Sequence, residues 1–107
     1  MFASPRELGR KKAEAYTAGA GTDVFSADMT MLHNGLVRVT VCVSAAATMY
    51  IRYDGVNWVC FEASPLVADT PRSFSFSMPR GEAFNVRFSA NCTIRLLFLE
   101  EVDSAVA

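Results

Sequence analysis

Apolar and polar residues alternate one by one along most of the chain beyond residue 24. In the clearest run, residues 36–44, valines occupy every second position: Val37, Val39, Val41 and Val43. Successive side chains of a β-strand point to opposite faces, so this pattern predicts a strand with one buried face. The other face carries Arg38, Thr40, Cys42 and Ser44. A chain patterned in this way has to pair its strands into sheets that share a core.

Six further segments show this alternation or an apolar run of strand length: 24–32, 49–53, 58–61, 73–78, 84–89 and 92–102. Turn signals such as Asp54-Gly55 and Pro79-Arg80-Gly81 separate the strands at intervals of roughly 8 to 12 residues. No helical period interrupts them. We therefore predict an all-β fold, an antiparallel β-sandwich of about seven strands and of jelly-roll or immunoglobulin-like type. The strand order stays open.

The first 22 residues differ from the rest of the chain in charge. They carry four basic against two acidic residues, whereas residues 23–107 carry six arginines against nine acidic residues. Ser4, Pro5 and Glu7 form a helix-start pattern, which predicts a short helix from Pro5 to about Thr17. We therefore divide the chain into an N-terminal arm, residues 1–22, and a β-sandwich domain, residues 23–107. The candidate docking residues of the arm are Leu8, Lys11, Lys12 and Tyr16.

The last predicted strand is apolar on both faces. Strict alternation places Ile94, Leu96 and Phe98 on the core side, and therefore Leu97 and Leu99 on the opposite side. An antiparallel sheet with a wet outer face does not need this second apolar stripe. Either the arm or the 62–72 connection covers it, or another subunit does. We favour the subunit and predict that Leu97 and Leu99 lie at a contact in a homo-oligomer.

The sequence shows no arrangement typical of a catalytic or metal site, so we expect no enzyme and no cofactor. The three cysteines are too far apart for a metal-binding pair, and their odd number does not form a disulfide framework; they are Cys42, Cys60 and Cys92. His33 lies in a predicted turn, and Glu100 and Glu101 point to opposite faces of a strand. The net charge of −1 argues against nucleic-acid binding, and no apolar run is long enough to span a membrane.

An aromatic cluster around the predicted Asp54-Gly55 hairpin offers an alternative function. Tyr50, Tyr53 and Trp58 could form a platform on which a sugar ring stacks. Aromatic residues beside a hairpin more often complete the end of a core. A carbohydrate-binding β-sandwich module is therefore the alternative function and not the favoured one.

Two segments carry a resemblance to a known class of proteins. The sequence of residues 50–59, Tyr-Ile-Arg-Tyr-Asp-Gly-Val-Asn-Trp-Val, and that of residues 78–88, Met-Pro-Arg-Gly-Glu-Ala-Phe-Asn-Val-Arg-Phe, resemble strand-turn-strand segments of small β-sandwich virion proteins of tailed bacteriophages. Capsid decoration or cement proteins of this class are often trimeric and clasp neighbouring subunits with terminal arms. Tail, adaptor and fibre components share much of this character. The resemblance implies no active site.

These expectations combine into one hypothesis. The chain is a non-enzymatic phage virion structural protein, of the capsid decoration or cement type. It forms a homo-oligomer, with a trimer favoured, and docks through its arm on the major capsid protein or another virion protein. We expect it to assemble in the reducing host cytoplasm and to reside in the virion.

Overall fold

The computed structural model describes residues 9–33, 35–53 and 65–102, and the backbone of residues 58–60. These residues form two antiparallel sheets and no helix, which confirms the predicted all-β class. No helix long and apolar enough to cross a membrane occurs in these ranges. In chain order the strands are β1 (Arg10–Lys12), β2 (Thr17–Ala18), β3 (Met29–Thr30), β4 (Gly35–Val43), β5 (Met49–Arg52), β6 (Trp58–Cys60), β7 (Arg72–Met78), β8 (Ala83–Phe88) and β9 (Cys92–Val102).

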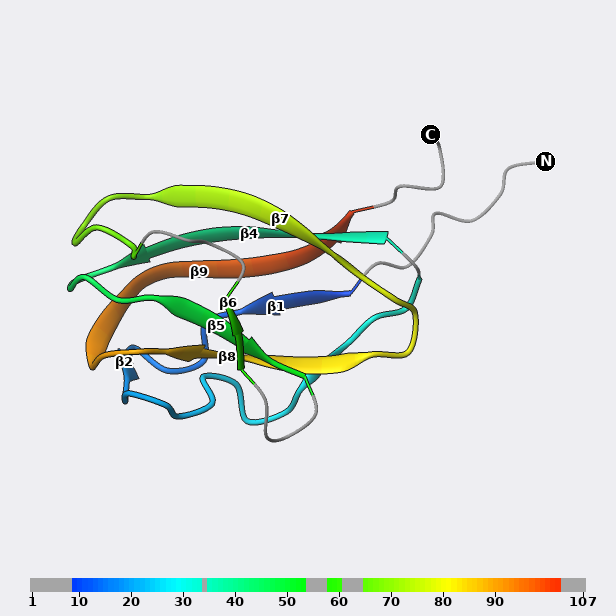
Figure 1. Ribbon diagram of the computed structural model, residues 1–107, viewed down its shortest axis with the longest axis horizontal. Coiled ribbons are helices and arrows are strands. Elements are labelled where there is room, and N and C mark those ends of the chain that lie inside the picture. The colour runs from blue at the N-terminus through cyan, green and yellow to red at the C-terminus, as the bar shows by residue number, and fades with distance from the viewer. Residues whose placement is uncertain (1–8, 34, 54–57, 61–64, 103–107) are drawn as a thin grey trace.

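The first sheet has the order β1-β9-β4-β7, with β2 also paired to β9, and the second has the order β3-β8-β5-β6. β4 and β9 form the longest ladder, which runs from Leu36 opposite Val102 to Val43 opposite Ile94. Figure 1 shows β4 between β7 and β9, with β5 and β8 in the other layer. The arrangement is that of two sheets that share one core, as in a β-sandwich.

The core lies between the two sheets and follows the predicted alternation in most strands. The valine face of β4 is fully buried, as are the inward residues of the second sheet: Ile51, Phe84, Val86 and Phe88. Phe76 of β7 and Phe84 of β8 link the sheets through an edge-to-face contact, with ring centroids 5.8 Å apart. Fully burying one side chain of this kind contributes about 1.5–3 kcal/mol, so this layer is the main source of stability.

Residues 9–17 contain no helix, and residues 10–12 and 17–18 are strands, so the helix predicted from Pro5 to about Thr17 is wrong for the described part of that segment. β1 pairs with β9 from Arg10 opposite Glu100 to Lys12 opposite Phe98, and β2 pairs beyond it. A short helix is marginal alone, whereas strand pairing satisfies the backbone groups along the edge of β9. Ala18 is buried in the core. Residues 9–22 therefore join the sandwich and do not stand apart from it.

The strand predicted over residues 24–32 is reduced to β3. Val24 and Phe25 turn into the core, and the Asn85 side chain holds Phe25 at both of its backbone groups. Phe25 N–H donates to Asn85 Oδ1 over 3.1 Å, and Asn85 Nδ2 donates to the Phe25 carbonyl over 2.9 Å. These two side-chain hydrogen bonds take the place of the backbone pairing that Phe25 would have in a continuous strand.

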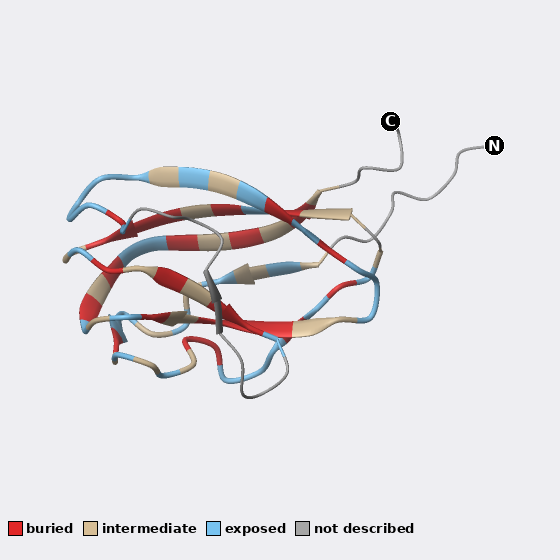
Figure 2. Ribbon diagram, viewed as in Figure 1, coloured by how far each residue is buried: buried red, intermediate tan, exposed pale blue. Residues whose placement is uncertain are grey.

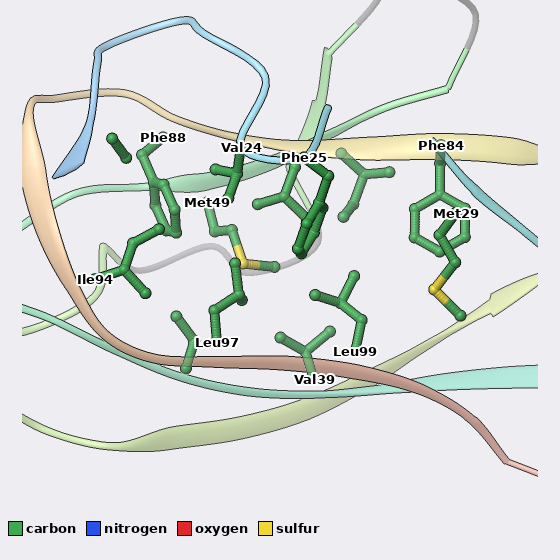
Figure 3. Close-up of a cluster of buried hydrophobic side chains, with 14 of the residues drawn as sticks. Val24, Phe25, Met29, Val39, Met49, Phe84, Phe88, Ile94, Leu97 and Leu99 are labelled. Carbon is green, nitrogen blue, oxygen red and sulfur yellow. The ribbon is translucent and has the colours of Figure 1, made fainter. Parts of the chain in front are cut away.

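β9 changes face partway along its length. Its pairing with β4 shifts by one residue, from Cys42 opposite Leu96 to Val43 opposite Ile94, so Arg95 is the extra residue of a β-bulge. Ile94 points into the core before the bulge, and Leu97 and Leu99 point into it after the bulge (Figure 3). Figure 2 shows the corresponding exposed stretch of β9 between two buried stretches.

The bulge overturns the predicted faces of β9. Leu96 is 45% exposed and Phe98 is half-buried, so the prediction that both face the core is wrong. Leu97 and Leu99 are 2% and 0% exposed, so their predicted place on an outer face is wrong too. The core of the same chain takes both side chains, and they are not available for a contact with another subunit.

Glu101 is a buried carboxylate that fixes the far end of β9. Its oxygens accept hydrogen bonds from the backbone N–H groups of Gly9 at 2.8 Å, His33 at 2.6 Å and Leu32 at 3.4 Å. The carboxylate therefore ties the segment before β1 and the β3–β4 connection to one point. Glu100 faces outward, as the predicted opposite placement of the two acids requires.

Candidate binding groove beside strand β9

A groove of about 400 Å³ lies beside β9, and we call it the β9 groove. It is lined by Lys12, Ala13, Tyr16 and residues 94–98. It belongs to the edge of the first sheet, between β1 and β2. Its volume lies within the range of roughly 300–1,000 Å³ found for ligand sites.

The groove forms where the N-terminal segment leaves β9 for a short distance. Ala13 N–H donates to the Leu97 carbonyl over 2.9 Å, and Ile94 N–H donates to the Tyr16 carbonyl over 2.6 Å. Between these two hydrogen bonds, residues 14 and 15 lie across from the bulge of β9. A bulge bends its strand and leaves the extra residue outside the regular ladder. The gap in pairing thus coincides with the irregularity in β9.

The groove carries an apolar surface that is open to solvent. Tyr16 is 81% exposed, and Leu96 is also among the exposed large apolar residues. The half-buried Phe98 ring lies under Lys12, whose Nζ is 5.8 Å from the ring centroid. Such a cation–π contact holds a charge next to an apolar surface. Adjacent apolar side chains on a surface mark an interaction site more often than scattered single ones do.

Two cationic side chains of β1, Arg10 and Lys12, lie at this edge of the first sheet, and Lys12 lines the groove, although the chain as a whole has a net charge of −1. Arg38 Nη2 lies 2.7 Å from Glu100 Oε1, and Arg95 Nε lies 3.0 Å from Asp69 Oδ1. Arg10, opposite Glu100 on β9, and Lys12 have no carboxylate partner among the described residues. Two cations are therefore left for a partner on this side of the molecule.

The structure brings together only some of the residues that the sequence suggests. Lys12 and Tyr16 line the groove. Lys11 does not; it lies with its Nζ 5.6 Å from the Phe25 ring centroid and 3.8 Å from Glu14 Oε1. Leu8 lies outside the described residues. Leu96 and Phe98 are the surface residues that sequence reasoning missed, since it placed them in the core.

The aromatic platform for a sugar stays a prediction. Tyr50 is half-buried on β5, opposite Arg87 and Cys60, while Tyr53 lies beyond the end of that strand. The side chain of Trp58 lies outside the described residues, as does the predicted Asp54-Gly55 turn. The antiparallel pairing of β5 with β6 agrees with a hairpin between them.

A second polar cluster serves the fold. Arg52 Nε and Nη2 donate to the two oxygens of Asp23 at 2.8 and 2.7 Å, and Nη2 also donates to Asp28 Oδ1 at 2.8 Å. The hydrogen bonds from Arg52 hold the pKa of Asp23 below its usual value, and those to Asp23 raise the pKa of Arg52. Arg87 Nε also donates to Asp23 Oδ1, at 2.5 Å, so two arginines balance two carboxylates and the cluster holds residues 23–28 against β5 and β8.

The thiols and metal-binding side chains form no second site in the described ranges. Cys42 and Cys92 are free and buried, and burial raises the pKa of the Cys92 thiol. No group of three or more His, Cys, Asp or Glu side chains is close enough there to hold a metal ion. Comparison with known proteins finds no matching family model, no matching curated protein and no matching solved structure.

Proposed function

We propose that this chain is a non-enzymatic structural protein of a phage virion, of the capsid decoration or cement type, which docks on other protein subunits. The observation that carries the proposal is the β9 groove, an exposed apolar surface next to paired strands. A protein that binds the assembled lattice, and not its free subunits, stabilises that lattice by mass action. Docking alone is sufficient for this role, and no reaction is required.

The strand order supports a jelly roll as the type of sandwich. With β1 and β2 counted as one interrupted strand, the first strand pairs with β9, β3 pairs with β8, β4 with β7, and β5 with β6. This nested order is that of a ribbon rolled into two sheets. Jelly rolls occur in viral capsid and lectin domains. A fold of this kind supports the class of protein by analogy only.

Self-association, with a trimer favoured, and contact with the major capsid protein or another virion protein complete the proposal. Their support is the resemblance of residues 50–59 and 78–88 to virion proteins that are often trimeric. Because β1 and β2 pair with β9, we assign docking by the N-terminal segment to Lys12 and Tyr16 at the groove and not to a free helix.

Particle association tests the proposal. We expect a tagged wild-type chain, expressed during assembly, to sediment with purified particles in a density gradient. Leu96→Asp changes an exposed side chain of the groove, and we expect it to reduce particle binding while the circular dichroism spectrum stays unchanged. Absence of the wild-type chain from particles contradicts the proposal. For self-association, light scattering after size exclusion should give a multiple of the chain mass, and a strict monomer at micromolar concentration contradicts that part.

A further inference from the structure

We infer that the β9 groove receives an acidic segment of a partner protein, whose apolar side chain enters the groove and whose carboxylates pair with Arg10 and Lys12. This inference rests on the proposed function, because it names the chemistry of the partner at the same surface. It commits to a polypeptide and not to a nucleic acid, a sugar or a second copy of this chain.

The apolar half of the inference follows from the lining of the groove. Tyr16 on one side and Leu96 on the other remain exposed, and Phe98 forms part of the same surface. A volume of about 400 Å³ accommodates a large apolar side chain. A side chain inserted there would cover groups that the fold leaves in contact with water.

The acidic half follows from the charges beside that lining. Three described carboxylates near the groove are engaged within the fold: Glu100 by Arg38, Asp69 by Arg95, and Glu14 by the backbone N–H of Ser26 and by Lys11. Arg10 and Lys12 lie two residues apart on β1, so their side chains share one face of the sheet. The contact of Lys12 with the Phe98 ring keeps its ammonium group close to the apolar surface. Complementary charge at such a place selects the partner and speeds its association.

The same charges disfavour two other occupants. A two-fold contact with its axis near Arg10 and Lys12 would bring like charges together, and away from the axis a second copy would have to offer carboxylates, whereas Glu100 and Asp69 are already paired. A nucleic acid would need many more phosphate contacts than two unpaired cations provide, on a chain whose net charge is −1. An acidic polypeptide needs only one or two carboxylates in addition to its apolar anchor.

Peptide titration with the full chain tests the inference. The probes are three fluorescein-labelled nonapeptides that differ only in charge. The acidic peptide has a central Phe-Glu-Leu flanked by Glu residues. In the neutral and the basic peptide, Gln and Lys replace every Glu. Anisotropy is measured at low and high salt, and amide chemical shifts of the ¹⁵N-labelled protein report the binding position. We expect saturable binding of the acidic peptide alone, with shifts at Ala13, Tyr16 and Leu96.

Variants separate the two halves of the contact. Leu96→Asp should weaken binding of the acidic peptide by about tenfold or more, since it removes apolar area and adds repulsion. Lys12→Glu should weaken it by up to about fivefold at low salt and much less at high salt, as expected for an exposed pair. The matched control is Leu32→Asp, at a leucine that is 38% exposed and outside the groove lining. It should bind like the wild-type chain.

Four results would overturn the inference: no saturable binding of the acidic peptide, equal binding of the neutral peptide, competition by a poly-dT oligonucleotide, or amide shifts of Tyr16 and Leu96 that depend on the concentration of the free ¹⁵N-labelled protein, which would place a second copy in the groove. The particle assay distinguishes these failures from failure of the proposed function. A chain that sediments with particles but ignores the acidic peptide leaves the function standing and removes the partner chemistry. A chain that binds the acidic peptide but does not sediment with particles removes the proposed function and leaves the partner chemistry standing.

Discussion

Glu101 and Glu100 are adjacent residues of the same type, and the bulge in β9 decides which of the two is buried. With strict alternation from Ile94, positions 96, 98 and 100 would face the core, and Glu100 would be buried. Because Arg95 is the extra residue, Glu101 is buried, with an exposed fraction of 2%, and Glu100 pairs on the surface with Arg38. Replacing each glutamate in turn by glutamine therefore tests in solution whether β9 contains the bulge.

The expected cost of Glu101→Gln follows from its three backbone donors. A glutamine offers one carbonyl oxygen and one NH₂ group, so at least one N–H of Gly9, Leu32 or His33 loses its acceptor. Losing a hydrogen bond to a charged group and leaving a buried donor unpaired costs about 2–4 kcal/mol. Glu100→Gln should cost less than about 1 kcal/mol, because it removes an exposed ion pair.

Urea unfolding, followed by circular dichroism and by the fluorescence of the single tryptophan, measures the difference. With a urea m-value of about 2 kcal/mol/M, Glu101→Gln should lower the midpoint by about 1–2 M, whereas Glu100→Gln should lower it by less than about 0.5 M. The slope should be the same for all three proteins. Equal midpoints for the two variants, or a lower midpoint for Glu100→Gln, would refute the assignment of the bulge.

Three further predictions address the core, the N-terminal strands and the ion-pair cluster. Leu97→Ala should cost about 2–5 kcal/mol in unfolding free energy, whereas Leu96→Ala should cost less than about 1 kcal/mol; equal costs in urea melts would contradict the two faces described. Deleting residues 2–22 removes β1, β2 and the buried Ala18, and should lower the thermal midpoint measured by calorimetry, while an unchanged midpoint would show that these strands do not pair. Arg52 holds the pKa of Asp23 below its unfolded value. That stability is present above about pH 4, the unfolded value of an aspartate, and is lost as the pH falls through the lower folded value. The unfolding free energy of Asp23→Asn should therefore depend less on pH in this acidic range than that of the wild-type chain, and identical pH profiles would exclude the linkage.

The alternation of apolar and polar residues predicts most strands of the sandwich correctly, because in those strands the apolar face of the sequence pattern is the face that the structure buries. The valines of β4 and the aromatic residues of β7 and β8 need only the rule that alternate side chains share a face. The N-terminal strands could not be predicted in this way. β1 is three residues long and consists of Arg-Lys-Lys, so its own sequence carries no strand signal, and the edge of β9 that it pairs with lies almost ninety residues away.

The faces of β9 could not be predicted for a different reason. Ile94, Leu96, Leu97, Phe98 and Leu99 are all apolar, so a strand with either phase buries apolar side chains. The pairing with β4 resolves the ambiguity, because only a one-residue shift lets Ile94 and Leu97 face the core together. Of the candidate site, the sequence suggests Lys12 and Tyr16, and it misses Leu96 and Phe98 because their exposure depends on that shift.

The bulge therefore links the packing of the core to the candidate site. By adding Arg95 to one side of the ladder, it turns Leu97 and Leu99 inward and leaves Leu96 and Phe98 outside. The same bend lies beside the place where the N-terminal segment separates from β9, between its hydrogen bonds to Leu97 and Ile94. A regular strand in the phase of Ile94 would bury Leu96 in place of Leu97, and the groove would lose that part of its apolar lining. Bulges are over-represented at sheet edges and next to active sites, where they change the direction of a side chain. The irregularity that misleads sequence reasoning about β9 is thus also the reason to look for binding at this position.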